Sequence, residues 1–141
     1  MPETQTYANH KRFDPWFHFL AFGLLAVAFV LSLVHLWHGR TALWQVLVSV
    51  ALLVLWARIR IYALRVQDRI IRLEETLRMN ALLPEPLRLR IQELQPGQFT
   101  ALRFASDAEL STRVQEALDG KLGNDAIKRR IQSWRADTFR V

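Results

Sequence analysis

The chain has 141 residues, of which 51% are hydrophobic, and carries a formal net charge of +6 at pH 7. This length limits it to one domain, or to a small domain with an anchor, and the apolar share is high for a soluble protein. Because it contains no cysteine, disulfides, thiolate catalysis and most zinc or iron–sulfur sites are excluded.

The first predicted element is a transmembrane helix over residues 15–37. A polar segment, residues 1–14, ends in Asp14-Pro15, an N-cap followed by proline at the first helical position. Residues 15–37 contain no Asp, Glu, Lys or Arg, and about 20 apolar residues suffice to cross a hydrocarbon core about 30 Å thick. A signal peptide is the competing interpretation, but the run exceeds its core of about 7 to 15 residues and LVHLWHG offers no small-x-small cleavage site.

A second apolar run follows the break His38-Gly39-Arg40-Thr41. It predicts a second span over residues 42–64, which would form a tight helical hairpin with the first span. Trp and Tyr concentrate where lipid tails meet headgroups. At 1.5 Å per residue the aromatic spacing is about 31 Å on the first span and about 27 Å on the second, which fits the bilayer twice. The aromatic residues that would mark the two faces are Trp16 with Tyr62, and Trp37 with Trp44.

The basic residues that flank the two spans predict the orientation. The loop between the spans has only Arg40, whereas Lys11 and Arg12 precede the first span. Five arginines follow within and after the second span: Arg58, Arg60, Arg65, Arg69 and Arg72. By the positive-inside rule, both termini of this multi-pass protein are expected in the cytoplasm.

No glycine or proline separates Ala42 from Leu83. One helix is therefore predicted to cross the membrane and to continue to about Asn80, with residues 65–83 as its cytoplasmic extension. Apolar residues recur along it at spacings of three and four, which place them on one helix face. We call this face the interaction stripe: Ile59, Tyr62, Val66, Ile70, Leu73 and Leu77. An apolar stripe in water needs a partner, either the tail of the same chain or a neighbour.

Breakers divide the basic tail domain, residues 84–141, into short helices. One is predicted from Pro84 to about Leu94 and another from Phe99 to Phe104, with a turn between them. Ser106-Asp107-Ala108-Glu109 has the form of a capping box that opens a helix ending at Gly120. A last helix would start at Gly123-Asn124 and carry these residues on its inner face: Ile127, Ile131 and Trp134.

This tail is too small to bury much of a core by itself, so it should pack against the interaction stripe. The predicted fold class is all-α: a transmembrane helical hairpin whose second helix extends into the cytoplasm, followed by a small bundle of short helices.

Four polar residues lie inside the spans near the loop and are expected to line the seam between the two helices: Ser32, His35, Gln45 and Ser49. Interhelical hydrogen bonding, worth about 0.6 to 2 kcal/mol per contact, is the favoured interpretation. A small proton, quinone or ligand site is the alternative, because polar groups at this depth are costly and often functional.

Only three of the 19 Lys and Arg residues precede position 57. A basic tail beside a bilayer is drawn to anionic headgroups at about 1 kcal/mol per residue. The expected contacts with an anionic surface are Arg58, Arg60, Arg65, Lys128, Arg129, Arg130 and Arg135. Nucleic acid is the less favoured partner, because acidic residues are interspersed and no helix-turn-helix pattern is clear.

Three motifs, QTYANHKRFDPWFHF, ALRFASDAEL and IKRRIQSWRADTFRV, resemble an uncharacterised family of small bacterial membrane proteins that share a domain of unknown function. The resemblance covers nearly the whole chain. It implies a protein of the bacterial inner membrane with two spans and a helical tail, and it implies no activity and no functional residue.

These patterns favour a cytoplasm-facing adaptor, scaffold or accessory subunit that binds a protein partner or a second copy of itself. A membrane-tethered nucleic-acid binder and a small redox or transport subunit that uses the polar seam are the alternatives. No catalytic residue, cofactor or metal site is expected. His18 and His35 are about 25 Å apart along one helix, for example, and cannot clasp one metal.

Overall fold

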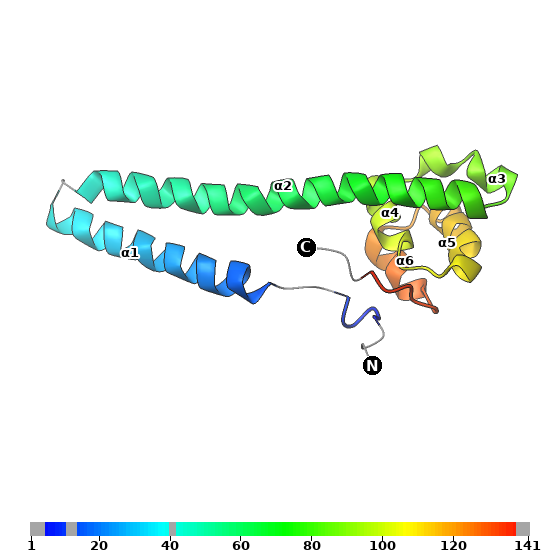
Figure 1. Ribbon diagram of the computed structural model, residues 1–141, viewed down its shortest axis with the longest axis horizontal. Coiled ribbons are helices and arrows are strands. Elements are labelled where there is room, and N and C mark those ends of the chain that lie inside the picture. Colours follow the sequence, from blue (N-terminus) through cyan, green and yellow to red (C-terminus); the bar gives the residue numbers. More distant parts are fainter. Residues whose placement is uncertain (1–4, 11–13, 40–41, 138–141) are drawn as a thin grey trace. The chain divides into compact units, whose positions relative to one another are not determined.

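The computed structural model describes residues 5–10, 14–39 and 42–137, and its regular structure is helical (Figure 1). In this described part of the chain, β-type pairing is confined to an isolated bridge between Ala105 and Trp134. The predicted all-α class is confirmed. The helices follow in this order: η1 (Trp16–Ala21), α1 (Phe22–His38), α2 (Leu43–Leu82), α3 (Glu85–Arg88), η3 (Ile91–Glu93), α4 (Pro96–Leu102), α5 (Asp107–Asp119) and α6 (Asn124–Arg130).

The chain divides into two compact units. Residues 12–64 form the hairpin unit, and residues 1–11 and 65–140 form the tail unit. The 40-residue helix α2 contributes residues to both. Its limits are close to the predicted ones. It ends at Leu82 because Pro84, just after this end, lacks an N–H and adopts an extended backbone (ψ 152°).

In the hairpin unit, α1 and the first part of α2 run antiparallel (Figure 1). Phe17 and Trp56 stack at one end with ring centroids 5.0 Å apart, and His35 contacts Gln45 at the other. The predicted N-cap is present, since Asp14 Oδ1 accepts the N–H of Trp16 at 3.0 Å. Both helices are long and apolar enough to cross a membrane. The basic pair before the first span and the two central loop residues, 40 and 41, lie outside the described residues.

The core of the tail unit collects residues from α2 and from every later helix. Its largest fully buried side chains are those of Phe99, Phe104, Met79, Leu102, Leu110, Ile127 and Val114. Met79 and Leu83 at the end of α2 belong to the same cluster. As expected for so short a tail, the core is completed by α2.

Two of the short helices differ from the predicted limits. The helix expected up to Leu94 is split into α3 and η3, and α4 begins earlier than Phe99. The early start has a local cause: Gln95 and Gln98 form a capping box around Pro96. Buried Gln98 also donates from Nε2 to the carbonyl oxygens of Ala117 and Leu122, at 3.2 and 2.9 Å. It therefore ties the start of α4 to the end of α5.

The capping box predicted at Ser106 is wrong. Ser106 is the N-cap of α5, but its side chain makes no capping hydrogen bond. The carboxylate of Glu109 instead accepts the backbone N–H groups of Gln132 and Ser133, at 3.2 and 3.0 Å. This explains a second correction: α6 ends at Arg130, and the residues that follow form an extended segment held by Glu109 and the bridge to residue 105.

Candidate functional site

The interaction stripe lies in the open on α2. Its exposed fractions are 61% for Ile59, 53% for Tyr62, 58% for Val66, 51% for Ile70, and 62% each for Leu73 and Leu77. The last four belong to the tail unit. The expectation that the chain's own tail covers this stripe is wrong, which leaves the neighbour as the remaining alternative.

The tail packs on a different face of α2, formed by Ile71, Glu75 and Met79, which are 6%, 4% and 0% exposed. Spacing of four residues puts these three on one side of the helix. A charged residue in the middle of this face is what concealed it in the sequence, because a glutamate does not belong to an apolar stripe. Its carboxylate is satisfied inside the fold.

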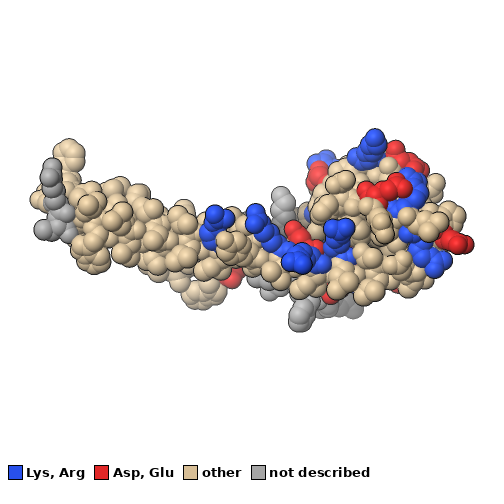
Figure 2. Space-filling view, turned by 90° about the horizontal axis from the view of Figure 1, so that it is seen from above, with Lys and Arg blue, Asp and Glu red and all other residues tan. Residues whose placement is uncertain are grey.

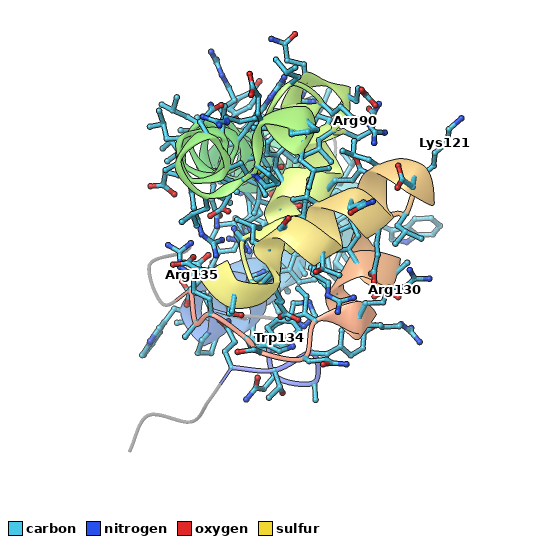
Figure 3. All side chains as sticks on the ribbon, turned by 90° about the vertical axis from the view of Figure 1, so that its right-hand side faces the viewer. Arg90, Lys121, Arg130, Trp134 and Arg135 are labelled. Carbon is cyan, nitrogen blue, oxygen red and sulfur yellow. The ribbon has the colours of Figure 1, made fainter. Side chains whose placement is uncertain are left out.

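Glu75 is the centre of an ion network. Its Oε2 lies 2.9 Å from Nη1 of Arg78, and its Oε1 lies 3.2 Å from Nη1 of Arg135. Arg78 also donates to Asp107 at 2.6 Å and to the carbonyl oxygen of Ala105 at 2.7 Å. Figure 3 shows Arg135 on the C-terminal segment, near the side of the tail unit where α2 lies. The network joins α2, the start of α5 and the C-terminal segment.

The polar seam is placed at the interface of the hairpin unit. Ser32 and Ser49 are 4% and 8% exposed, but each hydroxyl donates to a carbonyl oxygen of its own helix, at 2.6 and 2.8 Å. His35 Nδ1 and Gln45 Oε1 are 3.4 Å apart across the seam. Among the four predicted seam residues there is thus one cross-helix polar contact, and the two hydroxyls are satisfied within their own helices.

Trp56 is a seam residue that sequence reasoning missed. Its indole N–H donates to the carbonyl oxygen of Phe17 at 3.1 Å, and its ring contacts both Phe17 and Phe22 at 5.0 Å between centroids. The signal was its depth, about a turn and a half inside the aromatic residues that would mark the interface. A tryptophan at that depth needs a hydrogen-bond acceptor in the protein.

The expected anionic-surface contacts fall into two groups. In the tail, Arg129 pairs with Asp125 at 2.9 Å and Arg130 with Glu116 at 3.7 Å. Lys128 lies over the Phe104 ring at 5.6 Å. Arg135, as described above, reaches the buried glutamate of α2. The charges of these tail cations are therefore largely committed to contacts within the tail unit.

The second group lies on α2. Within the described residues, no carboxylate forms an ion pair with Arg58, Arg60 or Arg65. Figure 2 shows the contrast between the two units: tan atoms cover the apolar hairpin, while blue and red atoms mix over the tail. Of the expected contacts, those next to the apolar segment are therefore the ones without a carboxylate partner among the described residues.

The N-terminal segment docks on α6. Tyr7 donates its hydroxyl proton to Asp125 at 2.6 Å, and Gln5 accepts the backbone N–H of Asp137 at 2.7 Å. His10 is buried against the rings of Phe104 and Trp134, with its ring centroid 5.9 Å from each of theirs. The hydrogen bond to Asp125 raises the pKa of Tyr7, and the same bond holds the pKa of Asp125 below its ordinary value.

These shifts predict the pH range over which the N-terminal segment stays docked. A raised tyrosine pKa stabilises docking below the ordinary value of about 10, and this contribution is lost as pH rises through the raised pKa. A lowered aspartate pKa acts above the ordinary value, and its contribution is lost as pH falls through the lowered pKa.

The tyrosine titration can be measured directly. The tyrosines are Tyr7 and Tyr62, so tyrosinate absorbance of the Tyr62→Phe variant reports Tyr7 alone. Titration should occur above the ordinary pKa and should move back towards it in the Asp125→Asn variant. An unshifted titration in the Tyr62→Phe variant would contradict the docked arrangement.

A groove of about 660 Å³ opens on the tail unit between α4 and the connection from α5 to α6. Two of its polar lining residues are already engaged: Gln98 donates to the carbonyl oxygen of Ala117 at the end of α5, and Asn124 donates to Thr100 at 2.8 Å. Lys121 points away from the helices (Figure 3). In the residues that the structure describes, no three His, Asp or Glu side chains gather closely enough to hold a metal ion.

Comparison with known proteins yields a family. The model of a family of unknown function, DUF6526, matches residues 1–141. No curated protein and no solved structure matches the chain. The match agrees with the resemblance of the three motifs to a family without an assigned activity.

Proposed function

We propose that this chain, which belongs to the DUF6526 family, is a membrane-anchored adaptor or accessory subunit that presents the stripe of α2 to a protein partner on the cytoplasmic side. The observation that carries the proposal is the exposure of Val66, Ile70, Leu73 and Leu77 on a helix whose other face is packed. Contiguous apolar surface of this kind marks an interaction site.

Burial supports the membrane anchor. In both long helices, 6% of the most apolar 18-residue window is buried inside the protein. A core helix of a soluble protein would be mostly buried. The apolar surfaces of these two helices are exposed and would be removed from water by insertion into lipid. The aromatic residues expected at the interfaces are also exposed, with Trp16 at 73%, Trp37 at 89% and Trp44 at 62%.

Cytoplasmic termini are part of the proposal on the strength of the basic flanks. The bacterial inner membrane is part of it on the strength of the resemblance of the three motifs. Arg58, Arg60 and Arg65 would lie beside the headgroups and bind anionic lipid, each contributing about 1 kcal/mol. The tail cations support an adaptor over a nucleic-acid binder, because their carboxylate and ring partners would compete with phosphate.

The orientation can be tested by cysteine labelling, since the parent chain has no cysteine. His38→Cys next to the loop should react with an impermeant maleimide added outside intact cells. Gln115→Cys, on the exposed face of α5, should react only after the cells are opened. Labelling of the α5 cysteine from outside would show that the topology is inverted and would refute the cytoplasmic adaptor.

The adaptor role can be tested with one substitution on the stripe. Leu73→Asp should abolish crosslinking of the chain into any larger assembly in its native membrane, because burial of an unpaired carboxylate is strongly unfavourable. The variant should still be inserted in the membrane, so it should remain in the membrane fraction after carbonate extraction.

The matched control is Leu89→Asp, since Leu89 is 79% exposed and lies off the stripe. It should leave crosslinking unchanged. Equal crosslinking in the Leu73 variant and the parent would refute the role of the stripe.

A further inference from the structure

The tail-unit part of the stripe has the spacing of a coiled coil. Val66, Ile70, Leu73 and Leu77 are separated by four, three and four residues, which corresponds to heptad positions d, a, d and a. Among parallel coiled coils, a β-branched residue at a with leucine at d favours two strands. The central pair, Ile70 and Leu73, has this pattern, whereas Val66 at d and Leu77 at a do not. The pattern therefore favours pairing with another helix over nonspecific hydrophobic contact.

The charges beside the stripe follow the same register. Arg69 occupies position g and Glu74 occupies position e. In a parallel two-stranded coiled coil, a g residue lies next to the e residue of the following heptad on the other helix. This register brings Arg69 of one copy to Glu74 of a second copy, and it does so twice because the arrangement is symmetric.

Both charges are free for that contact. In the described part of the chain, neither Arg69 nor Glu74 forms an ion pair, and both are exposed. The residue four positions after Glu74 would ordinarily compete for it. That residue, Arg78, is turned to the other side of α2, where it pairs with Glu75 and Asp107.

We propose that the occupant of the stripe is a second copy of this chain, joined through a parallel α2–α2 contact with Ile70 and Leu73 at its centre and Arg69–Glu74 pairs at its edges. This inference rests on the proposed membrane anchor: two copies inserted in the same orientation present their α2 helices in parallel. Two heptads are short for a coiled coil in solution, and confinement to one membrane raises the effective concentration that holds them together.

The test uses single cysteines in the otherwise cysteine-free full chain in native membranes. Under mild oxidation, Leu73→Cys and Ile70→Cys should each form an interchain disulfide, because a and d residues meet their own counterparts in a parallel pair. Gln115→Cys on α5 should give background crosslinking only. Absence of disulfides at both stripe positions would overturn the dimer. A disulfide formed only when the Val66→Cys and Leu77→Cys chains are produced together would indicate an antiparallel pair and would also overturn it.

Charge exchange tests the register separately. Arg69→Glu alone and Glu74→Arg alone should each reduce crosslinking at position 73 several-fold, because like charges then face each other. The double exchange should restore it. A double variant no better than the single ones would contradict the predicted pair.

The two proposals fail differently. If copies do not crosslink but Leu73→Asp still removes the chain from a larger assembly, the adaptor stands and the dimer is refuted. If Leu73→Asp changes no assembly at all, both are refuted.

Discussion

Phe104→Ala is expected to lower the free energy of unfolding of the tail unit by about 3 to 5 kcal/mol, the usual cost of removing a buried aromatic side chain. Phe104 is 0% exposed. Its ring contacts Trp134 at 5.0 Å between centroids, and the guanidinium of Arg103 lies 4.6 Å from its centre. Alanine would leave a cavity where the N-terminal segment and the C-terminal segment both dock.

The measurement is urea unfolding of the full chain in lipid nanodiscs, followed by hydrogen exchange of the amides in α4 and α5. Exchange localises the loss of stability to the tail unit and separates it from the hairpin. Leu89→Ala is the control, because a substitution at an exposed site changes stability by about 0.5 kcal/mol or less. If both variants unfold alike, Phe104 is not part of a shared core.

Local signals in the sequence predicted the helices well. Absence of charge predicted the apolar hairpin helices, and Pro84 predicted the end of α2. Asp14 was identified as an N-cap and accepts the expected N–H of Trp16. These features depend on neighbours within a few residues, so they can be predicted from the local sequence alone.

Features that depend on distant partners were missed. Glu109 matched a local capping pattern, yet it binds backbone N–H groups more than twenty residues away. Spacing of four residues would favour a pair between Glu74 and Arg78, but Arg78 pairs with Glu75 and Asp107 instead. When a charged side chain has two possible partners, tertiary geometry decides which pair forms, and the helical periodicity of the sequence does not predict that geometry.

The candidate site shows the same division. Helical spacing identified the stripe residues, and position along the spans identified the seam residues. Neither signal indicated which face of α2 the tail covers. Apolar count favoured the stripe over the face with Ile71 and Met79, because Glu75 interrupts that face. The ion network around Glu75 outweighs this difference in apolar residues, and the stripe residues remain exposed.

Glu75→Ala is expected to destabilise the tail unit by about 3 kcal/mol, at the lower end of the range for breaking a buried ion pair. The side chain of Glu75 is 5% exposed, and its loss leaves Arg78, at 11%, with a charge in a dry site. The loss is not at the upper end because Arg78 keeps Asp107 and the carbonyl oxygen of Ala105.

Glu75→Gln separates charge from shape, since the amide keeps one acceptor oxygen for the arginines, and its loss of stability should fall between the parent and the alanine variant. Asp68→Ala on α2 is the matched control, because Asp68 is exposed and forms no ion pair among the described residues. Urea unfolding with hydrogen exchange provides the readout. If the Glu75 and Asp68 variants lose equal stability, the network does not hold the tail to α2, and the choice of face that leaves the stripe open would need another cause.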